Sequence, residues 1–99
     1  MISEKWDEKV IELAKSLINC QSYSGHEDKA AEALKAYMKE TGVFEEIETD
    51  CYGNVIGHIK GKNPGLKVLF DGHIDTVPVG NLKDWKHDPF HAVVEDGKL

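Results

Sequence analysis

The spacing of apolar residues changes near residue 42, and this change limits the folds that the chain can adopt. Within residues 4–19, Val10, Leu13 and Leu17 recur at intervals of three or four. That spacing places them on one face of a helix, so we expect an amphipathic helix here, with Ser3 as its N-cap.

A second helix is predicted after a turn-rich link over residues 21–25. Ser24 and Glu27 have the spacing of a capping box, in which each side chain accepts a bond from a backbone N–H at the helix start. Leu34 would lie on the inner face of this helix, and Gly42 is a natural residue for its end.

Beyond Gly42 the pattern becomes that of strands. Residues 43–50 alternate in part between apolar and polar, which is typical of a strand with one exposed face. A turn over residues 52–54 leads to a second predicted strand over 55–60. Residues 66–70 are more continuously apolar, so we expect a central strand there. The predicted fold class is therefore α/β.

The last residues predict another hairpin. Residues 92–99 read as a strand, a tight turn at Asp96 and Gly97, and the first residues of a further strand. Because that strand would begin at the last two residues, we expect the sequence to be truncated. Residues 1–99 contain no repeat and no linker, so we expect them to form one portion of a single domain.

Composition excludes several classes of partner. The 99 residues carry a formal net charge of -6, which argues against nucleic acid and against an anionic membrane surface. No apolar run approaches the ~18 residues of a membrane span, and the N-terminus does not resemble a signal peptide. Cys20 and Cys51 are therefore expected to be free thiols, and the protein is expected to be cytoplasmic.

The segment most suited to chemistry is the His-x-Asp sequence at the end of the predicted central strand. In an extended chain, residues two apart point to the same face, so His73 and Asp75 would lie side by side. A metal-ligating histidine commonly donates its second ring N–H to a carboxylate. This pair is thus a candidate metal ligand with its orienting acid, although such a spacing also occurs on ordinary surfaces.

Other residues that could bind metal or react have simpler explanations. The remaining histidines and the two cysteines are expected to be exposed, satisfied or incidental, because no partner base or ligand set is evident; the histidines are His26, His58, His87 and His91. Pro89 lies between His87 and His91 and disfavours the regular helix that would bring an i, i+4 pair together. Trp85 and Phe90 are expected to be packing residues near the rim of the site.

Several motifs together resemble the M20 metallopeptidase family, which includes acetylornithine deacetylase, succinyl-diaminopimelate desuccinylase and carboxypeptidase G2. Residues 69–78, LFDGHIDTVP, are similar to its first signature. Earlier in the chain, residues 22–27, SYSGHE, resemble the family's entry to the second helix, and residues 50–55, DCYGNV, resemble its Asp-x-x-Gly-Asn-Val turn. The WKHDPF and DGKL sequences near the end also match, in family order. Residues 79–85 most resemble the branch of selenium-metabolism-linked hydrolases.

The resemblance implies a fold and a chemistry. Residues 1–99 would be the N-terminal portion of a zinc-peptidase-like catalytic domain with a central mixed sheet. His73 would bind one of two zinc ions (cobalt or manganese being alternatives), and Asp75 would orient it. The metals would activate a bridging water to hydrolyse an amide in a small peptide or N-acyl amino acid. The family's lid domain could form a homodimer.

The resemblance also implies that the site is incomplete in these residues. The family's remaining ligands and general base would follow Leu99, and a catalytic zinc needs about three protein ligands. We therefore expect the chain alone to be inactive. Two alternatives are a non-catalytic binding module of related fold and a free-standing interaction domain that ends at residue 99. A downstream Gly-Arg-Gly-x-x-Asp segment would favour the enzyme.

Overall fold

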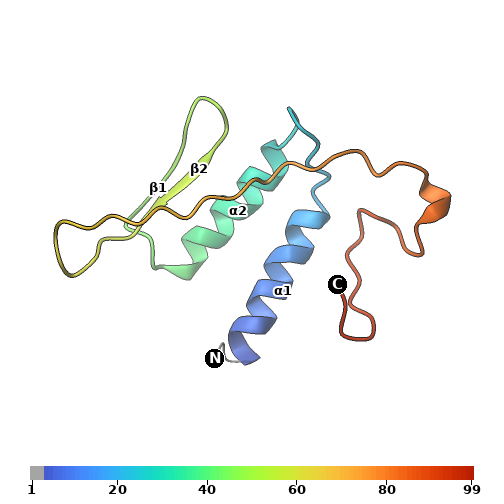
Figure 1. The fold of residues 1–99 in the computed structure, drawn as a ribbon, viewed down its shortest axis with the longest axis horizontal. Coiled ribbons are helices and arrows are strands. Elements are labelled where there is room, and N and C mark those ends of the chain that lie inside the picture. The colour runs from blue at the N-terminus through green and yellow to red at the C-terminus, as the bar shows by residue number, and fades with distance from the viewer. Residues whose placement is uncertain (1–3) are drawn as a thin grey trace.

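Two helices form the first part of the structure, a computed structural model that describes residues 4–99. Helix α1 (Glu4–Ile18) packs beside helix α2 (Asp28–Thr41), as Figure 1 shows. Both helices were predicted from their apolar spacing and are confirmed. The N-cap predicted at Ser3 lies outside the described residues. Helix α2 ends at Gly42, whose φ of 68° is a conformation that glycine adopts readily.

Two short strands follow the helices and form an antiparallel hairpin. Strand β1 (Glu46–Thr49) pairs with β2 (Val55–His58), with Thr49 opposite Val55 at the turn end. This is the only sheet among residues 4–99. Two of the predicted strands are therefore confirmed with narrower bounds, but a central mixed sheet is not seen.

The turn between β1 and β2 is organised by the Asp50 carboxylate. One of its oxygens accepts the backbone N–H groups of Tyr52 and Asn54, each at 2.9 Å, and the other accepts the Asn54 side-chain amide at 2.8 Å. The side-chain bond from Asn54 is the main reason that the pKa of Asp50 lies below its ordinary value. Gly53 completes the turn with a φ of 86°.

We expect Asp50→Ala to destabilise the protein in a pH-dependent manner. A carboxyl whose pKa is lowered by folding stabilises the folded state above its unfolded pKa, and loses that effect as the pH falls through the folded pKa. The difference in unfolding midpoint between wild type and Asp50→Ala should therefore be present at neutral pH and shrink below the ordinary pKa of 3.8. Denaturant unfolding across this range measures it. Cys51→Ala, in the same turn at an exposed position, is the control, and a difference independent of pH would contradict the prediction.

Helix α2 contacts the hairpin at a position where only glycine fits. A Cβ atom on Gly57 would lie 2.3 Å from Met38 Cε and 2.5 Å from Phe44 Cδ1. The terminal methyl of Met38 can turn away, but the Phe44 ring is bulkier and has fewer rotamers. The close approach of α2 to β2 therefore depends on the missing side chain of Gly57.

After β2 the chain runs in an extended path past the link between α1 and α2 (Figure 1). Within this path the central strand predicted over residues 66–70 is wrong: none of these residues belongs to a strand or bridge in the described structure. Leu66, Leu69 and Phe70 are 86%, 88% and 92% exposed. A strand is defined by its hydrogen-bonded partners, and residues 4–99 place none along this segment, whatever its apolar content.

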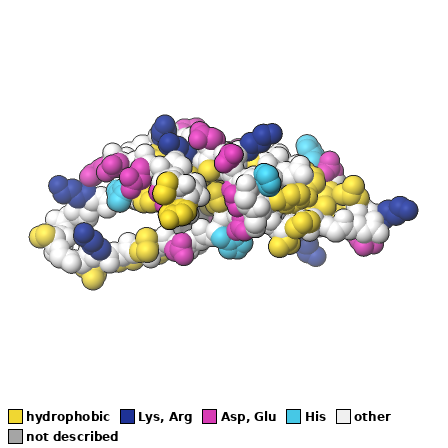
Figure 2. Space-filling model, turned by 90° about the horizontal axis from the view of Figure 1, so that it is seen from above, with side chains coloured by type: hydrophobic (Ala, Val, Ile, Leu, Met, Phe, Trp, Pro, Cys, Tyr) yellow, Lys and Arg dark blue, Asp and Glu magenta, His cyan; other side chains and the backbone are white. Residues whose placement is uncertain are grey.

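The described residues bury little of their apolar surface. Ala30 and Ala31 are the buried hydrophobic residues, and Ser22 is the buried polar one. The radius of gyration is 15.9 Å, whereas a compact chain of this length would have about 13 Å. Figure 2 shows hydrophobic side chains spread along the surface between charged ones. Residues 4–99 therefore form an open arrangement of elements rather than a closed core.

The turn predicted near the end of the chain is confirmed. Asp96 and Gly97 have φ values of 51° and 71°, as the two central residues of a type I′ hairpin turn require. Glu95 and Lys98 form an antiparallel bridge across it. The flanking strands extend no further than this single bridge, and a short 3-10 helix, η1 (Leu82–Asp84), lies earlier in the same region.

Candidate metal-ligand site

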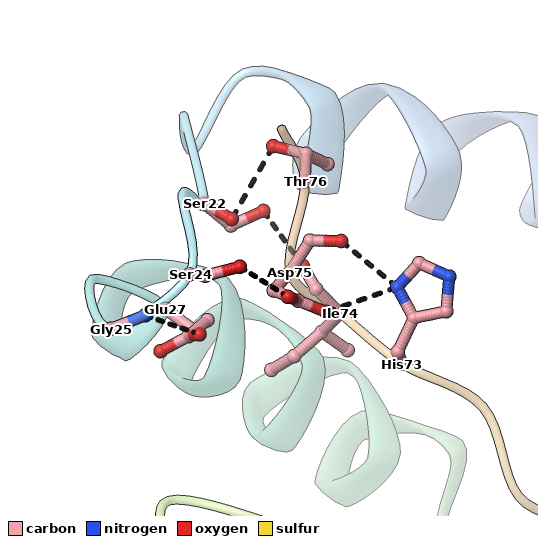
Figure 3. Close-up of polar contacts among 8 residues, drawn as sticks. All are labelled: Ser22, Ser24, Gly25, Glu27, His73, Ile74, Asp75 and Thr76. Atoms are coloured by element: carbon pink, nitrogen blue, oxygen red, sulfur yellow. Dashed lines mark hydrogen bonds and ion pairs between the residues drawn. The ribbon is translucent and has the colours of Figure 1, made fainter. Parts of the chain in front are cut away.

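The His-x-Asp segment is held in place by the link between α1 and α2. Residues 22–24 run parallel to residues 74–76, with an isolated bridge between Tyr23 and Thr76. The Thr76 N–H donates to the Ser22 carbonyl at 2.7 Å. The Thr76 hydroxyl also donates to this carbonyl at 3.3 Å, and the Ser22 hydroxyl donates to the Ile74 carbonyl at 2.7 Å (Figure 3). Because Ser22 is only 4% exposed, these bonds are shielded from water and clamp the extended segment.

His73 and Asp75 lie side by side, as their spacing predicted. Nδ1 of His73 is 3.1 Å from Asp75 Oδ1 and 2.9 Å from the Asp75 carbonyl oxygen. A carbonyl and an ionised carboxylate can only accept hydrogen bonds, so Nδ1 must be the donor. In the neutral ring the lone pair then lies on Nε2, and the His73 side chain is 86% exposed. The ring is thus oriented to offer one nitrogen to a ligand.

The Asp75 carboxylate is kept ionised by its neighbours. Its pKa is lowered, chiefly by the hydrogen bond from the Ser24 hydroxyl. Desolvation opposes this as the next largest effect, and the charge and hydrogen bond of His73 lower the pKa further. Ser24 Oγ donates to Asp75 Oδ2 at 2.5 Å while Oδ1 faces His73 (Figure 3). Both carboxylate oxygens therefore have a defined partner.

The capping box predicted for Ser24 is wrong. Helix α2 has Glu27 at its N-cap with no side-chain cap bond, and the Ser24 hydroxyl is directed to Asp75. Glu27 instead accepts the backbone N–H of Gly25 at 2.7 Å. The contacts of Ser22 and Ser24 with the His-x-Asp segment were missed by sequence reasoning. Their i, i+2 spacing was the one available signal, since it places both side chains on one side of an extended chain.

The donor set of this region fits one metal ligand but no complete site. Nε2 of His73 is an imidazole nitrogen of the kind that zinc binds. A hollow of about 460 Å³ lies beside it, lined among others by Glu27, Asn54 and Asp75. Yet no group of three or more His, Cys, Asp or Glu side chains within residues 4–99 is arranged to hold a metal. The described residues thus contain one candidate ligand, the His73 ring, hydrogen-bonded to the Asp75 carboxylate.

The other histidines do not join this pair. His58 Nε2 lies 3.2 Å from Glu48, across the hairpin, and His87 Nε2 lies 2.9 Å from Glu95. Glu95 also accepts Lys86 at 2.8 Å, and these two partners, Lys86 first, lower its pKa. His26 and His91 are exposed, in agreement with the simpler explanation given to them.

The cysteines and two of the aromatic residues lie apart from the His73–Asp75 pair. Cys20 and Cys51 are both free thiols, as predicted. Trp85 donates its ring N–H to the Val79 carbonyl at 2.9 Å, and Phe90 meets the Tyr23 ring edge-on at 6.0 Å. Trp85 and Phe90 help to line a second hollow of about 540 Å³, which Ser22 and Thr76 also line. Phe90 thus packs against Tyr23, whereas Trp85 is 48% exposed. Neither residue lines the hollow beside His73, so their predicted place at the rim of that site is not seen.

A search of the described helices for one long and apolar enough to cross a membrane finds none. This agrees with the absence of a long apolar run in the sequence.

Comparison with known proteins identifies a relative. Succinyl-diaminopimelate desuccinylase of Beijerinckia indica subsp. indica is 36% identical over 98 aligned residues, which cover 93% of this chain and 25% of the relative. No family model and no solved structure matches. The chain thus spans about a quarter of the length of the curated relative that it matches.

Over nearly its whole length the chain is similar to a desuccinylase of the M20 family, which agrees with the resemblance inferred from its motifs. The particular protein to which the chain is similar is the succinyl-diaminopimelate desuccinylase.

Proposed function

We propose that the protein is a metal-dependent hydrolase of amide bonds, of the desuccinylase and deacylase type, acting on small peptides or N-acyl amino acids. The observation that carries this proposal is the His73–Asp75 pair, with Nδ1 bonded to the acid and the other nitrogen exposed. The similarity to a desuccinylase over 93% of the chain also supports the proposal. Residues 1–99 would be the N-terminal portion of the catalytic domain.

In this proposal each residue of the pair has one task. His73 binds a zinc ion through Nε2, with cobalt or manganese as alternatives. Asp75 accepts the Nδ1 proton, which fixes the tautomer and raises the basicity of the ring. A bound divalent ion would supply Lewis acidity toward the scissile carbonyl. The proposal also includes further metal ligands and a general base outside the described residues, a homodimer formed through a lid domain, and a cytoplasmic location.

A substrate screen of the complete protein tests the proposal. The protein would be loaded in turn with zinc, cobalt and manganese, and its metal content measured. Hydrolysis of N-succinyl and N-acetyl amino acids and of dipeptides would then be assayed by amine release. Metal-dependent hydrolysis of at least one class is expected. If the protein binds no metal stoichiometrically and hydrolyses none of these substrates, the non-catalytic binding module would be favoured instead.

We further expect a polypeptide limited to residues 1–99 to be inactive and to lack tight stoichiometric zinc binding. Residues 4–99 offer one oriented imidazole and no group of three donors, whereas a catalytic zinc uses about three protein ligands. Calorimetric titration with zinc, beside the amine-release assay, measures both properties. Saturable one-to-one binding of zinc, or turnover by this polypeptide, would show that the ligand set is complete without other residues.

A further inference from the structure

We infer that Ser24 is a positioning residue, whose hydroxyl holds the Asp75 carboxylate in the orientation that directs the His73 ring toward a metal. This inference rests on the proposed function, and it adds a residue from a different part of the chain. Ser24 lies 51 positions before Asp75 and donates from Oγ to Oδ2. Nothing in the helix-capping pattern of residues 24–27 anticipates that contact.

The geometry shows why the carboxylate needs a second partner. Asp75 Oδ1 accepts His73 Nδ1, while the Asp75 side chain is 40% exposed. A half-exposed carboxylate with one partner is free to rotate about its terminal torsion, which is broad. The bond from Ser24 to Oδ2 fixes that torsion, because the two oxygens then point to separate donors (Figure 3).

Ser22 and Ser24 contact different parts of the His-x-Asp segment. Ser22 bonds the backbone at Ile74 and is buried, so it sets the position of the segment. Ser24 bonds a side chain and is exposed, so it acts on orientation alone. This difference makes Ser24 open to substitution without disturbance of the clamp.

Zinc affinity of the complete protein, measured by competition with a chromophoric chelator, tests the inference. Ser24→Ala is expected to weaken zinc binding by about tenfold, at the lower end of the effect of removing a residue that orients a metal-binding histidine. Ser24→Thr retains the hydroxyl and should stay close to wild type. Ser24→Val has the size of the threonine without the hydroxyl and should resemble Ser24→Ala. Ser16→Ala, which removes an exposed hydroxyl in α1, is the control for general effects.

A double-mutant cycle separates positioning from mere structural support. If Ser24 acts through Asp75, Ser24→Ala should have no further effect on zinc affinity in an Asp75→Ala background. A structural role would give additive losses. In the wild-type protein, ¹⁵N NMR of labelled histidine should also show the His73 proton on Nδ1, with the His73→Ala spectrum giving the assignment.

The outcomes distinguish the inference from the proposed function. Zinc affinity unchanged in Ser24→Ala and Ser24→Val, additive losses in the cycle, or a proton on His73 Nε2 would each overturn the role of Ser24. Even with any of these three outcomes, a loss of zinc binding in His73→Ala would still support His73 as a ligand. Zinc binding retained in His73→Ala would overturn both.

Discussion

His73→Ala in the complete protein is expected to remove most of the hydrolytic activity and to weaken metal binding. Residues that only orient a metal-binding histidine are each worth about 10- to 100-fold in affinity or activity, so loss of the ligand should cost more than about 100-fold. His73 is 86% exposed and bonded only to Asp75 by its ring in the described structure. The substitution should therefore leave folding nearly unchanged. Metal content and kcat/KM together measure the effect.

The matched control for this result is His91→Ala. His91 is an exposed histidine on the loop after Phe90, outside the hollow beside His73. Its removal is expected to leave metal content and activity near wild type. If His91→Ala lost the metal and His73→Ala kept it, the metal site would have to lie around the 85–91 loop. The proposed role of the His-x-Asp pair would then be wrong.

The second large effect is expected in stability. Gly57→Ala should lower the free energy of unfolding by about 1–3 kcal/mol, as overpacking of a tight contact does. The added Cβ would lie 2.5 Å from Phe44 Cδ1 and against the flexible end of Met38. The Met38 methyl can turn away, but the Phe44 ring must shift. Denaturant unfolding of the complete protein measures the change.

Gly61→Ala is the control for the intrinsic effect of replacing glycine. The nearest atom to its Cβ would be the Asn63 carbonyl oxygen at 4.0 Å, so no clash arises. We expect a change within about 0.5 kcal/mol, as for other surface positions. Equal effects of the two substitutions would mean that the contact between α2 and β2 does not hold the hairpin in place.

Elements set by short-range interactions could be predicted from the sequence. The apolar spacing of α1 and α2 and the glycine at residue 42 suffice for the helices, because helical contacts join residues three or four apart. The turn at Asp96 and Gly97 likewise depends on its own residues. The central strand predicted over residues 66–70 was wrong, because apolar content alone does not supply a hydrogen-bonded partner.

The same distinction applies to the candidate site. The proximity of His73 and Asp75 follows from their spacing, since residues two apart in an extended chain have their side chains on one face. The bond of the Ser24 hydroxyl to Asp75, in place of one to the start of α2, depends on how distant segments pack. A serine hydroxyl can accept a backbone N–H at a helix start or donate to a carboxylate. Because residues 22–24 run parallel to residues 74–76, the Asp75 carboxylate is the partner within reach of Ser24.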